Sequence, residues 1–442
     1  MSGSLTIRGA QLVLPGRVVP GDLLIEDGVI TQLGPHIEAE AGEVIDGEGL
    51  TCLPGGIDTH VHFGDPGFTR SEDLSTGSRA AAAGGVTAFL DLPDTVPTTT
   101  TVGALHDKLA AAATRSATHF GFFLGATPEN VDVLRECSRA AGVLLNLAAM
   151  RDGRPLLDDE LLDTIVRQTS ARLVVIAQAA ERTQDRVDRF ADVTESSQHG
   201  VIYDERCYEQ GLKQILEITE RHGRALHVAH VSTQAELALL REHARPGLTA
   251  AVTPQHLFLG AEDAYARLGN RAVLLPPLRE RAHRAALWEA LRDDALCCVS
   301  SAHHAHRAES KERPYPSAPP GMPGVEWLLP VLLDQAAAGR CTLPQIARWF
   351  SEAPARTFRI PRKGRLEVGY DGDIVLVDTH RSRVVGSRPT RTRCGWSPWE
   401  GRYLTGWPVL TAILGEPVFR DDELVDGVLG QELTFTRTSE PT

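Results

Sequence analysis

Eight short apolar runs, separated by longer helical patterns, make up the middle of this chain. The runs cover residues 55–63, 88–94, 119–126, 142–149, 172–179, 225–232, 248–259 and 295–306. Between them lie stretches rich in Ala, Leu, Arg and Glu, with apolar residues at the i, i+3, i+4 spacing of an amphipathic helix. Eight strands alternating with helices predict an α/β fold, a (β/α)8 TIM barrel over residues 54–360, rather than an open sheet.

The two ends of the chain show a different pattern, in which apolar and polar positions alternate over short stretches. The first end contains LTIRGAQLVLP and GDLLIEDGVITQLG, and the second contains GRLEVGYDGDIVLVD and VLTAILGEPVF. Alternation of this kind, interrupted by glycines, predicts short strands joined by turns. We therefore expect one small β-sandwich domain built from both termini, residues 1–53 and 361–442, beside the TIM-barrel domain.

Composition narrows the class of protein. Of the 442 residues, 42% are hydrophobic and 23% are charged, which is typical of a soluble globular protein with a large core. No run of 18 apolar residues suggests a membrane span, and the first residues lack the basic leader of a secretory signal. The seven cysteines form no C-x-x-C pair, which predicts reduced thiols in a cytoplasmic protein. A net charge of −13 argues against nucleic-acid binding.

Histidines gather where the predicted barrel strands end. Six of them close the first, sixth and eighth runs: His60, His62, His230, His303, His304 and His306. The C-terminal ends of the strands carry the active site in a TIM barrel. His60 and His62 are two residues apart on one strand, so both imidazoles point the same way and can hold one cation. A single histidine is more often structural, but this pair indicates metal-site chemistry.

A series of motifs resembles those of dihydroorotases, which belong with hydantoinases and allantoinases to the amidohydrolase superfamily. The motifs are PGGIDTHVHFGDPGFT, AGGVTAFLDLPDTVPTTT, GFFLGATPEN, LHVAHVS, PPLRERAHRAALWEALRD and GYDGDIVLVD, and the match spans roughly residues 5–420. The resemblance implies a TIM barrel with a binuclear zinc site that hydrolyses a cyclic amide. It also implies the ligands: the H-x-H of strand one, a carboxylated lysine of strand four, histidines of strands five and six, and an aspartate of strand eight.

Three of the six ligand positions implied by this resemblance carry side chains that bind no metal. Leu144 stands at the position of the lysine, Ala177 at that of the strand-five histidine, and Ala302 at that of the aspartate. The four lysines, at positions 108, 213, 311 and 363, all lie far from residue 144 in the sequence. The lysine that bridges two metals in the family has no obvious replacement.

At most one metal ion is therefore expected. Two cations about 3.5 Å apart repel each other and need anionic bridges. Binuclear zinc with a carboxylated lysine is not expected. The remnant site, formed by His60, His62 and His230, is expected to hold a single zinc ion or none.

Positions that bind the substrate's carboxylate in dihydroorotases are altered as well. The resemblance implies an arginine where this chain has Gly64, and asparagines where it has Asp94 and Leu275. The resemblance also implies a histidine that contacts the substrate, and His306 stands at that position. It is the one implied substrate contact that this chain keeps. A carboxylate at Asp94 repels a carboxylated substrate, so we expect negligible hydrolysis of dihydroorotate.

Two functions from different classes stay open. In the first, the chain is a pseudoenzyme, a non-hydrolysing homologue that acts as a scaffold for a partner such as an aspartate transcarbamoylase of pyrimidine biosynthesis, or that forms a homo-oligomer. In the second, it acts on a different cyclic amide or related small molecule with at most one metal ion. The candidate catalytic residues for this altered chemistry are His303, His304, His306, Asp65 and Asp94.

Overall fold

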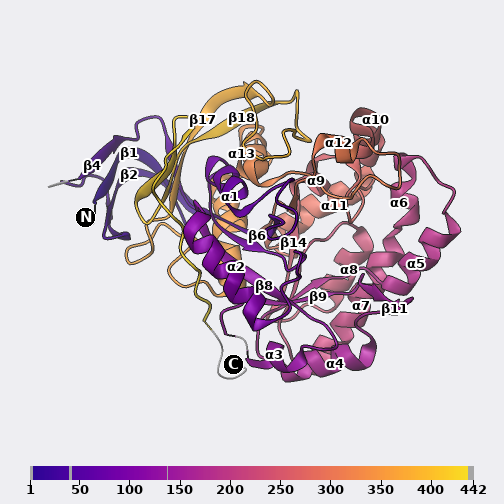
Figure 1. Ribbon diagram of the computed structural model, residues 1–442. Coiled ribbons are helices and arrows are strands. Elements are labelled where there is room, and N and C mark those ends of the chain that lie inside the picture. Colours follow the sequence, from indigo (N-terminus) through magenta and orange to yellow (C-terminus); the bar gives the residue numbers. More distant parts are fainter. Residues whose placement is uncertain (1–2, 39–41, 137, 437–442) are drawn as a thin grey trace.

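The computed structural model describes residues 3–38, 42–136 and 138–436 (Figure 1). The outermost residues of the predicted terminal domain, 1–2 and 437–442, lie outside this description. None of the helices in the described ranges combines the length and the apolar character needed to cross a membrane.

A curled parallel sheet forms the centre of the molecule. Its strands are β6 (Gly56–His62), β7 (Val86–Asp91), β8 (His119–Gly125), β9 (Gly142–Asn146), β12 (Leu173–Ile176), β13 (Leu226–Val228), β14 (Leu248–Val252), β15 (Cys298–Val299) and β16 (His303–His304). β15 pairs with β14, and β16 pairs with β6, so the single stretch 298–304 closes the sheet on itself. The predicted TIM barrel is confirmed.

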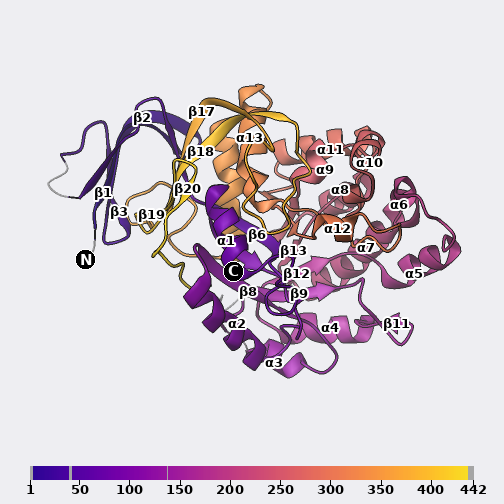
Figure 2. The same cartoon turned by 45° about the horizontal axis from the view of Figure 1, so that its top comes forward.

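Helices surround this barrel, as Figures 1 and 2 show. They are α1 (Leu74–Ala83), α2 (Val102–Arg115), α3 (Val131–Glu136), α4 (Asp159–Gln168), α5 (Ala180–Arg189), α6 (His199–Ile202), α7 (Glu205–Arg221), α8 (Gln234–Glu242), α9 (Pro254–Phe258), α10 (Ala261–Leu268), α11 (Arg281–Arg292), α12 (Ala308–Lys311), α13 (Leu328–Ala337), α14 (Leu343–Ala347) and α15 (Ala353–Phe358). Many begin at a polar cap. In α8, for example, Thr233 and Glu236 form a capping box that satisfies two otherwise unpaired backbone N–H groups.

Several predicted runs are shorter as strands than their apolar patterns suggest. The run over 248–259 gives β14 only as far as Val252. The Thr253 side chain then accepts a hydrogen bond from the backbone N–H of His256, and Pro254 begins α9. Proline suits the first turn of a helix because its missing N–H has no partner there in any case.

Strands from both termini form a second, nine-stranded sheet beside the barrel (Figures 1 and 2). They are β1 (Leu5–Leu14), β2 (Arg17–Glu26), β3 (Val29–Gly34), β4 (Glu43–Asp46), β5 (Thr51–Pro54), β17 (Ile374–Val384), β18 (Tyr403–Ile413), β19 (Glu416–Arg420) and β20 (Glu423–Leu424). Antiparallel pairing of β5 with β17 joins the two ends of the chain. Ile7, Leu23, Ile374 and Leu410 share one core although their strands are not all neighbours, which confirms a terminal β-domain folded over its own apolar interior.

Candidate metal-binding site at the barrel rim

One side of the rim carries a cluster of imidazoles. His60 and His62 lie at the end of β6, and His304 lies in β16, the strand beside it. The rings of His62 and His304 stack, with centroids 4.3 Å apart and planes 15° from parallel. The ring of His60 lies 5.0 Å from that of His62 and 5.1 Å from that of His230. Closure of the barrel thus brings together histidines from β6, from β16 and from the segment just after β13.

Asp94 reaches this cluster from the loop after β7, the strand on the other side of β6. Its Oδ2 lies 2.6 Å from Nδ1 of His62, while Nε2 of His62 lies 3.0 Å from Nε2 of His60. One ligand atom each from His62, Asp94 and His304 lie within 4.8 Å of one another, and no other three such side chains in the described ranges do so. Two imidazoles and a carboxylate are a common ligand set for zinc.

Burial keeps most of these imidazoles neutral. It lowers the pKa of His60 and of His304 well below 6.5, helped by the neighbouring histidines, and it lowers the pKa of His230 to about 4. Burial also acts to lower the pKa of His62, but the Asp94 carboxylate outweighs it and the pKa is raised. His62 in turn outweighs the effect of burial on Asp94 and holds its pKa below the usual range. The cluster is one imidazole–carboxylate pair surrounded by neutral imidazoles, the form in which histidine binds metals.

A buried carboxylate supports the backbone beneath this cluster. Asp58, in β6, accepts hydrogen bonds from the backbone N–H groups of His60 at 3.2 Å and Ser301 at 3.0 Å. Burial raises the pKa of Asp58 to about 6. Asp58 therefore ties the first strand to the stretch that closes the barrel. It lies two residues before His60, so the alternation of strand side chains was the signal that could have identified it.

A buried ion pair lies beside the cluster, and the sequence pattern did not predict it. Lys108, from the buried face of α2, lies 2.6 Å from Oδ2 of Asp91 and donates a hydrogen bond to the carbonyl of Leu92 at 3.1 Å. Asp91 closes β7 and also accepts from the backbone N–H of Phe63 at 2.9 Å. Lys108 is distant from residue 144 in sequence, but it approaches the rim from the second helix. A lysine at a buried helical position is the signal for such a pair.

His303, a candidate catalytic residue, does not join the cluster. Its ring is fully buried, and its Nδ1 accepts hydrogen bonds from the backbone N–H groups of Gly324 at 3.1 Å and Val325 at 3.3 Å. Its Nε2 lies 3.5 Å from Glu72. His303 thus connects the closing strand to the segment before α13.

Of the other two candidate residues, Asp65 pairs with an arginine of α2, and His306 lies next to the cluster. Asp65 pairs with Arg115 at 2.8 Å and accepts from the backbone N–H of Leu74 at 3.3 Å, so it joins the end of α2 to the start of α1. His306 extends the cluster, because its ring lies 4.4 Å from that of His304. Its Nε2 lies 3.0 Å from the carbonyl of Pro320, and burial lowers its pKa to about 4.

Farther along the rim, at β9 and β12, the positions implied for a lysine and a histidine carry apolar side chains. Leu144 is 4% exposed and belongs to a cluster of apolar side chains that includes Leu90, Val174 and Ala229. Ala177, just after β12, is also 4% exposed. Both positions are built as parts of the core.

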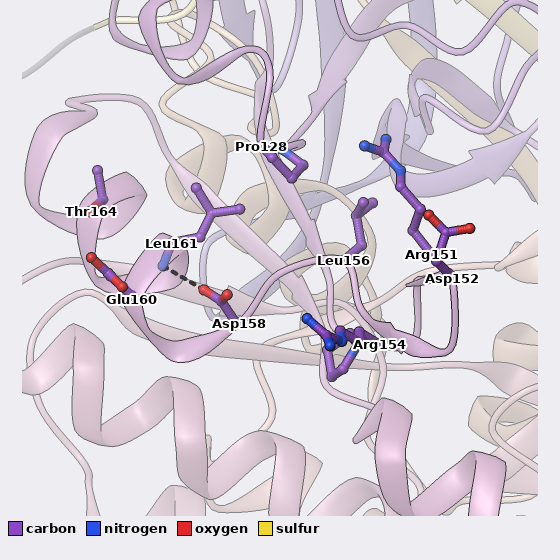
Figure 3. Close-up of a pocket in the computed structure, with 10 residues that line it drawn as sticks. Pro128, Arg151, Asp152, Arg154, Leu156, Asp158, Glu160, Leu161 and Thr164 are labelled. Carbon is purple, nitrogen blue, oxygen red and sulfur yellow. Dashed lines mark hydrogen bonds between the residues drawn. The ribbon is translucent and has the colours of Figure 1, made fainter.

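Two open cavities of about 700 Å³ each lie outside this apolar side. The first lies between the hairpin of β10 (Met150–Arg151) and β11 (Arg154–Pro155) and the start of α4. Figure 3 shows Arg151 and Arg154 beside it, and Asp158 accepting the hydrogen bond from Leu161 that begins α4. The second cavity shares Pro155 with the first, and neither is lined by a candidate site residue.

Comparison with known proteins finds a matching family, similar sequences and a similar solved structure. The sequence model of the amidohydrolase family matches residues 51–418. A dihydroorotase from Methanosarcina acetivorans is 32% identical over 435 residues, covering 95% of this chain and 92% of that protein. An allantoinase from Rubrobacter xylanophilus is 32% identical over 442 residues, covering 97% and 96%. The solved structure of an L-hydantoinase from Arthrobacter aurescens superposes with a TM-score of 0.92 at 27% identity, covering 98% of this chain and 100% of that one.

Proposed function

Because this chain belongs to the amidohydrolase family, we propose that it is a cyclic-amide hydrolase homologue that does not hydrolyse dihydroorotate. The observation that carries the proposal is the environment of Leu144. The resemblance to dihydroorotases implies a carboxylated lysine there, bridging two zinc ions. This chain instead has a side chain that is 4% exposed and packed among apolar neighbours. Without that anion, two cations about 3.5 Å apart repel each other.

The other residues present do not replace the bridge. Ala177 and Ala302 offer no ligand atom at the positions implied for a histidine and an aspartate. Lys108 is the lysine beside the cluster, but it pairs with the carboxylate of Asp91 at 2.6 Å. Carboxylation would convert its ammonium into an anion and place two negative groups side by side in a buried site. A binuclear zinc centre does not fit these residues.

The substrate-binding positions support the same proposal. Gly64 has a φ of +65°, and a Cβ there would lie 2.9 Å from Cβ of Phe68, so the arginine implied by the resemblance does not fit without backbone change. Asp94 adds a carboxylate where an asparagine is implied. Both differences weaken the binding of a ring that carries its own carboxylate.

We assign the retained barrel a scaffold role, either for an aspartate transcarbamoylase-like partner or within a homo-oligomer. The chain keeps the sheet and the core that the barrel needs to fold. The residues that the resemblance implies for hydrolysis are changed. The parallel sheet closes through the 298–304 stretch, and its interior is continuous and apolar. Because a fold by itself does not determine function, a scaffold role would depend on the surface of the barrel.

A second candidate function is favoured by the approach of His62, Asp94 and His304 to one another. Such a group can activate one water molecule on a single metal ion. In this alternative, the barrel opens or closes a cyclic amide that lacks a carboxylate, since Asp94 disfavours the carboxylated ring.

A substrate panel tests the proposal. The purified chain is assayed for ring opening of dihydroorotate, hydantoin and allantoin, with and without added Zn²⁺, and the Methanosarcina acetivorans dihydroorotase serves as the active control. We expect no turnover of dihydroorotate and no rescue of a strain lacking dihydroorotase. Turnover of dihydroorotate within about tenfold of the rate of the control enzyme would contradict the proposal.

The two candidate functions separate by a further pair of variants. If the chain is a scaffold, His60→Ala and His304→Ala leave co-purification with an aspartate transcarbamoylase, or the oligomeric state, unchanged. If it performs altered chemistry, the same variants abolish ring opening of hydantoin or allantoin. A reaction that depends on either histidine overturns the scaffold role.

A further inference from the structure

We propose that one divalent metal ion of the zinc class binds between His62, Asp94 and His304, a site different from the six ligand positions of the family. One ligand atom of each lies within 4.8 Å of the other two. The three come from adjacent parts of the rim: the end of β6, the loop after β7, and β16 on the other side of β6. His62 alone stands at a ligand position implied by the resemblance.

The charge of Asp94 distinguishes this site from the remnant site. His60, His62 and His230 would surround a dication with neutral imidazoles only. The site proposed here includes one carboxylate, and a carboxylate offsets half of the charge of a dication. Among the described residues, the hydrogen-bond partner of this carboxylate is His62, and no lysine or arginine pairs with it. It is therefore available to a cation.

The local geometry needs only a small change to admit an ion. The 2.6 Å contact between Asp94 Oδ2 and His62 Nδ1 is a hydrogen bond. Two atoms that both bind zinc at about 2.0–2.2 Å lie about 3.3 Å apart in a tetrahedral site. The carboxylate must therefore withdraw by about 0.7 Å as the ion takes the place of the shared hydrogen. The Asp94 side chain is 45% exposed, so it can make this movement.

The two histidine ligands are already positioned. Nε2 of His62 lies 3.0 Å from Nε2 of His60, which leaves Nδ1 of His62 facing Asp94. The backbone N–H of His304 donates to the carbonyl of Met322 at 2.9 Å, and Gly321, with a φ of +133°, allows that segment to approach closely. His60 is thus a positioning residue, since it fixes the ring orientation of a ligand.

The single site rests on the proposed function, in which the binuclear centre is lost. Experiment can reject the single site and the loss of the binuclear centre separately. The chain is stripped of metal with a chelator, dialysed, and titrated with Zn²⁺ by calorimetry and with Co²⁺ by visible absorption. We expect one equivalent of either ion per chain. Asp94→Asn and His304→Gln should each weaken the affinity at least about 100-fold, and His60→Gln about 10–100-fold.

Matched controls exclude general effects. His106→Gln, an exposed histidine of α2, and Asp132→Asn, an exposed carboxylate of α3, should bind Zn²⁺ as the unaltered chain does. His230→Gln should also keep the site. Urea unfolding of each variant establishes that it is folded, and Asp94→Asn keeps the shape of a partly exposed side chain.

Three results overturn the inference, each in a different way. Absence of binding at millimolar Zn²⁺ shows that the group is no site, and leaves the proposed function standing. Binding that is lost in His230→Gln but kept in Asp94→Asn assigns the ion to the remnant site. Two tightly held equivalents restore the binuclear centre and overturn the proposed function as well.

Discussion

Two sides of one barrel rim present opposite chemistry on the same backbone. The rim at β16, β6 and β7 presents His304, His62 and Asp94, while β9 contributes Leu144 and the residue after β12 is Ala177. Parallel pairing continues unbroken across both sides. Strand pairing and core packing therefore determine the barrel, while the residues at the rim vary independently of it.

The two sides are also supported differently. A charged group from another element stands behind the polar side, where Lys108 of α2 lies 2.6 Å from Oδ2 of Asp91. Leu144 packs among apolar side chains, and no charged group in the described ranges pairs with it. Removing a charge should therefore damage the first side, and adding a charge should damage the second.

The largest expected effect comes from adding a charge to the apolar side. Leu144→Lys removes a buried leucine and places an ammonium group among apolar neighbours. We expect the free energy of unfolding to fall by about 5 kcal/mol, since both the lost packing and the unpaired charge contribute. Leu144→Met, which keeps volume and polarity, should lose less than about 1.5 kcal/mol. Urea unfolding measures both, and a similar loss in the two variants would show that position 144 tolerates charge.

A smaller loss is expected from removing a charge on the polar side. Lys108→Met leaves the Asp91 carboxylate buried without its counterion, and we expect a loss of about 3–5 kcal/mol in the free energy of unfolding. The matched control is Lys213→Met at an exposed position of α7, which should change stability by less than about 0.5 kcal/mol. Replacing both members, with Asp91→Leu added to Lys108→Met, should restore part of the loss. An undamaged single variant would mean that water, not the lysine, stabilises the carboxylate.

The fold was largely predictable because local patterns and barrel topology agree. Each of the eight apolar runs overlaps a barrel strand, and the histidines of the first run lie at the rim. Less predictable was which of His303 and His304 faces the cluster. Consecutive strand residues point to opposite sides, so only one can do so. Ala302, at a φ of +45°, interrupts the alternation just before them, and the sequence carries no sign of this.

The partners of the site residues were not predictable either. Asp94 was identified as a changed substrate position, but its contact with His62 spans 32 residues and depends on the loop after β7. Lys108 meets Asp91 because α2, which packs on β8, turns its buried face toward the end of β7. Contacts of this kind are set by tertiary packing, which a single sequence does not display.

A pH-dependent effect should come from Glu326, a buried carboxyl in the segment between the closing strand β16 and α13. Burial raises the pKa of Glu326 from 4.5 to about 7. The hydrogen bond that its carboxylate accepts from the backbone N–H of Arg391, at 2.9 Å, only partly opposes this shift. A raised carboxyl pKa means that the folded state holds the proton more tightly. The resulting stability is complete below about pH 4.5 and is lost as the pH rises through 7, by about 3 kcal/mol in total.

Glu326→Gln should remove this dependence. Between pH 5 and pH 8 the unaltered chain should lose about 2–3 kcal/mol relative to the variant, measured by urea unfolding at each pH. Glu312→Gln, at an exposed carboxylate that pairs with Arg271, should follow the pH profile of the unaltered chain. Parallel profiles for the unaltered chain and Glu326→Gln would show that Glu326 is ionised throughout this range.

The smallest effect compares one alanine on each side of the rim. Ala302 has a φ of +45°, in the left-handed region that glycine adopts freely, whereas Ala177 is a buried core residue without a positive φ. Ala302→Gly relieves backbone strain of about 1–2 kcal/mol and gives back part of that as chain entropy, so we expect a net gain of about 0.5–1 kcal/mol. Ala177→Gly relieves nothing, loses a buried methyl group, and should destabilise by about 1–1.5 kcal/mol. Unfolding in urea at equal slopes gives both values. If position 302 is constrained by its backbone and position 177 by its packing, the two changes in the free energy of unfolding must have opposite signs. Changes of the same sign would show that the two positions do not differ in this way.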